Sequence, residues 1–185
     1  MNPVLPRLPL CITLALVAVL VLLGPIAQPA AYHAFADDTP VMGIPRAADV
    51  LSNLGFAVVA LWAFHRLRPH RGHPALALGW PGYRLFLLGL LGTAAGSAFY
   101  HWAPDDARLV WDRLPIALAC GGLLAAVASE TRHEADGRPR AALLALAAVL
   151  SVAWWVWTGA RGQGDLRPYL LLQAAPLVLV PVWQA

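Results

Sequence analysis

Six predominantly apolar segments recur along the chain, and each is close to the length of helix that crosses a lipid bilayer. A helix rises 1.5 Å per residue, so about 20 apolar residues span the hydrocarbon core of a membrane. Hydrophobic residues make up 59% of the sequence, whereas an ordinary globular domain has about 45–50%. The sequence therefore predicts an all-α, polytopic transmembrane helix bundle with about six spans. We expect these spans at Leu8–Ala27, Ala48–Leu67, Leu85–Trp102, Leu109–Glu130, Ala141–Gly159 and Pro168–Trp183.

The first span resembles a secretory signal peptide, because Arg7 precedes the apolar run Leu8–Gly24. The residues before a cut after Ala31, however, are Gln28-Pro29-Ala30, which is a poor small-x-small cleavage pattern. We therefore expect residues 1–28 to form an uncleaved N-terminal anchor span.

The chain has 13 arginines and no lysine; Arg113 falls inside an expected span, and the other twelve are unevenly distributed over the two sets of connections between the spans. The richer set holds Arg7, Arg66, Arg68, Arg71, Arg84, Arg132, Arg138 and Arg140, and the poorer set holds Arg46, Arg108, Arg161 and Arg167. Positive residues favour the cytoplasmic side of a membrane. We therefore expect the N-terminus to be cytoplasmic and the poorer set, including residues 103–108, to lie outside.

The composition argues against two other kinds of function. No basic run is interleaved with exposed aromatic residues, so we expect no nucleic-acid partner. Cys11 and Cys120 both fall inside expected spans without C-x-x-C spacing, so they are expected to be buried apolar residues and not a disulfide or a zinc site. The lipid bilayer is the partner that the composition implies.

Ser97, His101 and Asp112 place a hydroxyl, an imidazole and a carboxylate in or beside the expected spans. Ionisable groups in hydrocarbon are costly unless they are paired or used, so these residues are candidates for function. Ser97 and His101 are four residues apart and share one face of a helix. Asp112 begins the next span after the turn at Pro104-Asp105-Asp106, which is also suited to capping that helix. We expect the three side chains to converge at the outer face.

These three residue types suit zinc-dependent hydrolysis, which needs three protein ligands, an open position for water and a carboxylate that accepts a proton. In such a site His101 is a metal ligand, Asp112 is the general base, and Ser97 donates a hydrogen bond to the developing oxyanion. A purely structural interpretation stays open. In it, Ser97 bonds to a carbonyl of its own helix, His101 lies among the headgroups, and Asp112 caps a helix or pairs with Arg113.

Oxygen-bearing side chains gather at Asp37, Asp38, Asp49 and Asn53, and such a set suits calcium. The order lacks the D-x-D-x-D-G pattern of a helix-loop-helix calcium site. We therefore favour an interpretation in which Asp49 caps the second span and the loop aspartates are solvated, while the amide of Asn53, inside a span, must find a partner. His33 lies on the same outer face and is the next candidate participant.

Three stretches together resemble the alkaline ceramidase family, within the wider group of seven-helix membrane hydrolases that share a serine, an aspartate and three histidines. Ser97–His101 (SAFYH) resembles the family's S-x-x-x-H, and Asp112–Pro115 (DRLP) resembles its D-E-L-P. Asp49–Leu54 (DVLSNL) resembles the N-T-x-S-N-L of its first core helix, and Tyr32–Asp37 (YHAFAD) is similar to bacterial members. The resemblance extends from about Tyr32 to Pro115.

The resemblance implies a single transmembrane domain over residues 1–185, related to a family core of seven helices. It implies a bacterial inner-membrane protein that hydrolyses the amide bond of a ceramide-like lipid, releasing a sphingoid base and a fatty acid, at a site facing the periplasm. It also implies that His101 binds zinc, that Asp112 helps to activate the attacking water, and that Ser97 lies beside the metal.

The sequence departs from the family in two places. The family's other two zinc ligands form an H-x-x-x-H in its last helix, and no such pair occurs here. We therefore expect a C-terminally truncated member whose zinc site is incomplete. The family's glutamate at the start of its first core helix corresponds to Arg46, and its acidic cluster is reduced to Asp37 and Asp38, so the resemblance does not carry calcium dependence over.

The alternative is a non-catalytic membrane protein, either a lipid-binding, receptor-like protein or an inactive fragment of the family. In that case Ser97, His101 and Asp112 serve helix packing. A transporter is less well supported, because its interior polar residues should follow a path across the membrane, whereas these cluster at one face.

Overall fold

A computed structural model of the chain describes residues 7–37, 39–132 and 136–184. The regular structure of these residues is helical, apart from an isolated β-bridge between Val41 and Ile44. The elements follow one another as α1 (Leu8–Leu23), α2 (Ala47–Ser52), α3 (Leu54–Leu67), the 3-10 helix η2 (Arg68–His70), α4 (Pro74–Ala77), α5 (Trp80–Trp102), α6 (Asp106–Thr131), α7 (Arg138–Gly159) and α8 (Arg167–Gln184).

Four helical segments are long and apolar enough to cross a membrane, which confirms the expected helical membrane bundle. They are Ala47–His70, Trp80–Trp102, Asp106–Thr131 and Arg138–Gly159. The first and last expected spans are also helical, as α1 and α8, which have 16 and 18 residues. α1 is shorter than expected because Gly24, with φ of 72°, ends it and Pro25 follows.

The second expected span is divided between α2 and α3, which meet at Asn53. α2 begins after Arg46, whose φ of 46° is left-handed, and its first free backbone N–H groups are bound by Asp37. The break leaves Asp49 in the first turn of α2, one helical turn before Asn53. Asn53 is buried, with 5% exposure.

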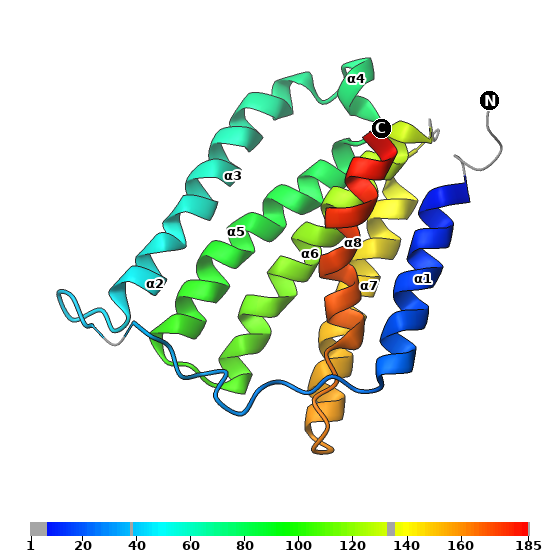
Figure 1. The fold of residues 1–185 in the computed structure, drawn as a ribbon. Coiled ribbons are helices and arrows are strands. Elements are labelled where there is room, and N and C mark those ends of the chain that lie inside the picture. Colours follow the sequence, from blue (N-terminus) through cyan, green and yellow to red (C-terminus); the bar gives the residue numbers. More distant parts are fainter. Residues whose placement is uncertain (1–6, 38, 133–135, 185) are drawn as a thin grey trace.

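The helices lie side by side with α5 and α6 at the centre of the bundle (Figure 1). α3 packs on α5 at one side, while α7 and α8 pack on α6 at the other, and α1 packs on α8. Residues 24–37 and 39–46 run beneath the helices, between the end of α1 and the start of α2 (Figure 1). They therefore cover the end of the bundle at which α5 finishes and α6 begins, which we call the turn end.

α5 and α6 make the most extensive contact between two helices, because glycines bring their backbones together. A Cβ atom added at Gly82 would lie 2.3 Å from the Ala126 nitrogen, and one added at Gly96 would lie 1.9 Å from the Trp111 oxygen. Gly89, midway between them, approaches Ala119 in the same way, at 2.5 Å. The spacing of seven residues along α5 keeps these glycines on one face, so the two antiparallel helices touch along most of their length.

α6 begins at Asp106, three residues before the expected span at Leu109, and Asp105 in the turn that the sequence indicated for capping is its N-cap. The backbone N–H of Arg108 donates to the Asp105 carboxylate at 2.7 Å, and this bond holds the pKa of Asp105 below its usual range. The buried apolar core lies mainly between α6, α7 and α8, around Leu109, Leu124 and Trp155.

Candidate functional site

The structure brings Ser97, His101 and Asp112 together at the turn end. Ser97 and His101 lie in the last two turns of α5, and Asp112 lies in the second turn of α6. Ser97 and Asp112 are buried, with 7% and 9% exposure, and the Ser97 hydroxyl, the His101 imidazole and the Arg113 guanidinium all act electrostatically on the carboxyl group of Asp112. The close contact at Gly96 holds the helices at this separation, because Gly96 meets the backbone of Trp111, next to Asp112. The chemical roles assigned to the three residues stay predictions.

Five buried side-chain polar atoms have no hydrogen-bond partner among the described residues. Two of them, Oδ1 of Asp112 and Nδ1 of His101, belong to the candidate residues, and the others are Nε of Arg46 and Nε and Nη1 of Arg113. Nδ1 of His101 faces Oδ2 of Asp49 in α2 at 3.5 Å, and the ring of Phe35 packs against the imidazole with 4.6 Å between ring centroids. The imidazole is therefore oriented by a carboxylate and an aromatic ring, while one oxygen of Asp112 remains available.

Three contacts that the structural interpretation expects are not found among the described residues, while its placement of His101 among the headgroups stays a prediction. Asp112 does not cap α6, because Asp105 does. In the part of the chain that the structure describes, Asp112 forms no ion pair with Arg113, and Ser97 makes no hydrogen bond to a carbonyl of α5. The guanidinium of Arg113 instead donates to Oε1 of Gln28 at 2.7 Å.

The side chains considered for calcium are engaged in helix hydrogen bonds. Asp37 accepts from the backbone N–H groups of Ala48 and Asp49, at 3.0 and 3.4 Å, so Asp37 and not Asp49 caps α2. Asn53 finds its partner within its own helix, where Nδ2 donates to the Asp49 carbonyl at 2.7 Å. Asp38 lies outside the described residues. Nη1 of Arg46 donates to the carbonyl of His101 at 3.5 Å, which places a cation near these carboxylates.

His33 also lies at the turn end, in the segment that covers it. Its Nδ1 is 2.9 Å from the Tyr100 hydroxyl and its Nε2 is 3.2 Å from Oδ1 of Asp106. His33 and Asp106 line a cavity of about 640 Å³, together with Gln28 and Trp155. His33 thus neighbours the candidate site through Tyr100, which is adjacent to His101.

The surroundings of Arg113 were not predicted from the sequence. This buried cation, 2% exposed, lies among aromatic rings, at 4.1 Å from the ring centroid of Trp155 and 5.5 Å from that of Tyr169. Aromatic faces attract a guanidinium, so they compensate part of its lost hydration. The position of Arg113 within an apolar segment is the sequence signal that could have indicated a buried cation with specific partners.

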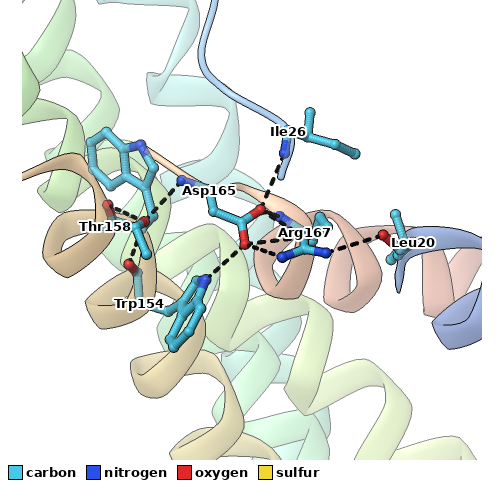
Figure 2. Close-up of polar contacts among 7 residues, drawn as sticks. Leu20, Ile26, Trp154, Thr158, Asp165 and Arg167 are labelled. Carbon is cyan, nitrogen blue, oxygen red and sulfur yellow. Dashed lines mark hydrogen bonds and ion pairs between the residues drawn. The ribbon is translucent and has the colours of Figure 1, made fainter. Parts of the chain in front are cut away.

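Asp165, between α7 and α8, was also missed, and it organises the other side of the turn end (Figure 2). It is 2% exposed and accepts hydrogen bonds from the Ile26 backbone, the Trp154 indole and the Arg167 guanidinium. Burial raises the pKa of Asp165, but the bonds from Arg167, Trp154 and Ile26 outweigh that effect and hold the pKa well below its usual range. Asp165 therefore ties the start of α8 to α7 and to the segment after α1.

The described residues do not by themselves fit a catalytic zinc ion, which needs three protein ligands. No group of three histidine, cysteine, aspartate or glutamate side chains that could hold a metal is present among them. His101 offers one imidazole, and its unpartnered Nδ1 faces the carboxylate of Asp49. Around Asp37 and Asn53, likewise, no group of three such side chains is present among the described residues.

No protein-family model matches the chain, and no match was found among curated proteins or among solved structures. The fold alone therefore defines the class of protein: a helical membrane protein with at least four helices suited to crossing the bilayer.

Proposed function

We propose that the chain is a membrane-embedded hydrolase of the alkaline ceramidase type, which cleaves the amide bond of a ceramide-like lipid at the turn end. The observation that carries the proposal is the convergence of the stretches on which the resemblance rests. Ser97 and His101 come from α5, Asp112 from α6 and Asp49 from α2, and their side chains meet at one place.

The residues of this site suit the polar steps of amide hydrolysis. Asp112 has a buried oxygen without a hydrogen bond, so it can accept a proton from an attacking nucleophile. The Ser97 hydroxyl, beside the same carboxylate, is placed to donate to the oxygen on which negative charge develops. Asp49 and Phe35 hold the His101 ring in a fixed orientation.

The proposal includes zinc because the resemblance implies it. When bound, zinc would activate a water molecule for attack on the amide carbonyl. His101 supplies one ligand, and the family pattern places the other two in an H-x-x-x-H helix. Calcium is not part of the proposal, because Asp37 and Asn53 are engaged in capping and helix hydrogen bonds.

We also propose the orientation that the arginines predict. Arg68, Arg71, Arg84 and Arg138 line one cleft at the end opposite the turn end, in agreement with a cytoplasmic location for that end. In a bacterial inner membrane the site would then face the periplasm. Labelling of a cysteine introduced at the exposed Gln163, in the α7–α8 turn of a variant in which Cys11 and Cys120 are replaced by serine, by a membrane-impermeant maleimide in intact spheroplasts tests this. Reaction is expected, while protection until lysis would reverse the orientation.

The metal is tested first, since the described residues supply only His101. A form of the chain extended by a helix that carries H-x-x-x-H is expected to bind about one zinc per molecule. His101→Ala should abolish zinc binding, whereas the matched variant His73→Ala, in the exposed connection before α4, should retain it. Absence of zinc from the extended form would end the zinc hydrolase proposal.

A non-catalytic lipid-binding protein is the second candidate, and the lack of three metal donors among the described residues favours it. Incubation with an N-acyl sphingosine separates the two. Release of fatty acid supports the hydrolase, whereas saturable binding without release, unchanged by His101→Ala, supports the lipid-binding protein.

A further inference from the structure

A second polar region lies at the end of the bundle opposite the candidate site. Four arginines line a cleft of about 1010 Å³, and they come from three separate parts of the chain. Arg68 is the first residue of η2, and Arg71 directly follows this helix. Arg84 lies near the start of α5, and Arg138 is the first residue of α7. All four side chains are exposed to solvent.

The charge of this arginine cleft is largely uncompensated. Within the residues that the structure describes, none of the four guanidinium groups forms an ion pair. The carboxylate that lines the cleft is that of Asp136, and its Oδ1 accepts from the backbone N–H of Arg138 at the start of α7. Among the described residues, four arginines and one carboxylate line this hollow, and such an arrangement suits a phosphate group, because a guanidinium binds phosphate oxygens through two parallel hydrogen bonds.

The wall of the cleft points to a lipid as the source of that phosphate. The cleft lies at the ends of α3, α5 and α7, all of which are candidate membrane spans. Phe64 and Trp80 line it, with their ring centroids 6.1 Å apart, and aromatic residues at helix ends lie at the level of the headgroups. One turn earlier on α3, Leu61 and Trp62 are 59% and 66% exposed, so an apolar surface adjoins the cationic one.

We propose that the arginine cleft binds the phosphate headgroup of an anionic phospholipid, whose acyl chains lie along the exposed apolar face of α3. This is a binding site separate from the turn end and independent of the proposed hydrolase. A headgroup bound there links η2 to α5 and α7 through one anion. Anionic lipids near arginine clusters are attracted electrostatically, and the cleft adds a defined geometry to that attraction.

The test uses the full chain in micelles of a neutral detergent. It is titrated with dioctanoyl phosphatidylglycerol, with dioctanoyl phosphatidylcholine and with sodium phosphate, while thermal unfolding and tryptophan fluorescence are followed. Phosphatidylglycerol is expected to bind saturably and to raise the Tm. Phosphatidylcholine, which is zwitterionic, and free phosphate, which lacks acyl chains, are expected to bind at least about tenfold more weakly, a loss equal to about 1.4 kcal/mol.

The variant Arg84→Gln/Arg138→Gln is expected to weaken phosphatidylglycerol binding at least about tenfold, as for the loss of charge-assisted hydrogen bonds. Arg161→Gln, an exposed arginine at the turn end, is the matched control and should bind as the wild type does. If the glutamine variant does not fold, Arg84→Lys/Arg138→Lys keeps the charge but removes the planar fork, and it should lose affinity several-fold. Unchanged affinity in these variants, equal binding of phosphatidylcholine, or free phosphate binding as tightly as phosphatidylglycerol would overturn the proposal.

Discussion

Asp112 and Asp165 are buried aspartates at the same end of the bundle, but their surroundings are opposite. Asp165 accepts hydrogen bonds from Ile26, Trp154 and Arg167 and forms an ion pair with Arg167 at 2.9 Å (Figure 2). Asp112 has the Ser97 hydroxyl and the His101 ring beside it, yet Oδ1 has no hydrogen-bond partner among the described residues.

The difference separates a structural carboxylate from a candidate for chemistry. A buried polar group costs free energy unless it is hydrogen-bonded, so a chain under selection for stability alone satisfies it as Asp165 is satisfied. Leaving an oxygen of Asp112 unsatisfied is explained when that oxygen has a transient partner. Substituting each carboxylate, and measuring both turnover and stability, tests whether the two aspartates have these different roles.

The largest effect is expected for Asp112→Asn on turnover. The amide cannot accept the proton that the proposed reaction requires, so amide hydrolysis by the zinc-loaded, extended chain should fall by about 10²–10⁴-fold. Zinc should stay bound, and the Tm should be unchanged or higher, because a neutral amide is less costly to bury than a carboxylate. Fatty-acid release, zinc content and thermal unfolding are measured together. Unchanged turnover would remove Asp112 from the mechanism.

Asp165→Ala should show the reverse pattern. The Trp154 indole and the Ile26 N–H lose their acceptor, which should lower the unfolding free energy by about 2 kcal/mol and the Tm by about 4–8 °C. Turnover at a temperature where the variant is folded should stay near that of the wild type. Asp165→Asn keeps one acceptor oxygen, so its Tm should lie between the Tm of the wild type and that of Asp165→Ala. A large loss of turnover in folded Asp165→Ala would show that Asp165, like Asp112, is needed for activity and does not serve stability alone.

Gly96→Ala tests whether backbone contact between α5 and α6 sets the geometry around Asp112. The added methyl group would meet the Trp111 carbonyl, so the helices must separate, at a cost of about 1–3 kcal/mol. Turnover should fall although no candidate side chain has changed. Gly55→Ala is the matched control, since nothing lies within 4 Å of that position in α3. Equal stability of the two variants would contradict the close contact.

The smallest effect concerns pH. The folded-state pKa of Asp165 is lowered, so its contribution to stability is present above the ordinary carboxyl pKa of about 4 and is lost as the pH falls further. The difference in Tm between the wild type and Asp165→Asn should therefore be constant from pH 7 to about pH 5 and shrink below about pH 4. A difference in Tm that grows on acidification would mean that folding raises the pKa of Asp165, which contradicts the prediction.

Local spacing in the sequence predicted the helices and the surroundings of Asp112, but not those of Asp165. The apolar segments indicated the helices, and the four-residue spacing of Ser97 and His101 with the turn before Asp112 indicated where these side chains meet. Gly24, with its positive φ, ended α1 early, and α2 and α3 meet at Asn53, whose side chain donates to the Asp49 carbonyl.

The surroundings of Asp165 were beyond sequence reasoning. Its bond to Ile26 joins residues 139 positions apart in the chain, and only the packing of α1 against α8 brings them together. The aromatic contacts of Arg113 with Trp155 and Tyr169 have the same origin. Motif spacing reports neighbours within one helix or across one turn, and long-range partners require the fold.

The glycines of α5 have a consequence for how the protein tolerates different membranes. Bilayers of different thickness are accommodated when helices tilt, and each tilt changes the distance between neighbours that touch through long side chains. α5 and α6 touch through their backbones at Gly82, Gly89 and Gly96, so they must tilt as one body. We therefore expect the spacing between His101 and Asp112 to change less with lipid composition than the position of α3, which lies at the periphery of the bundle.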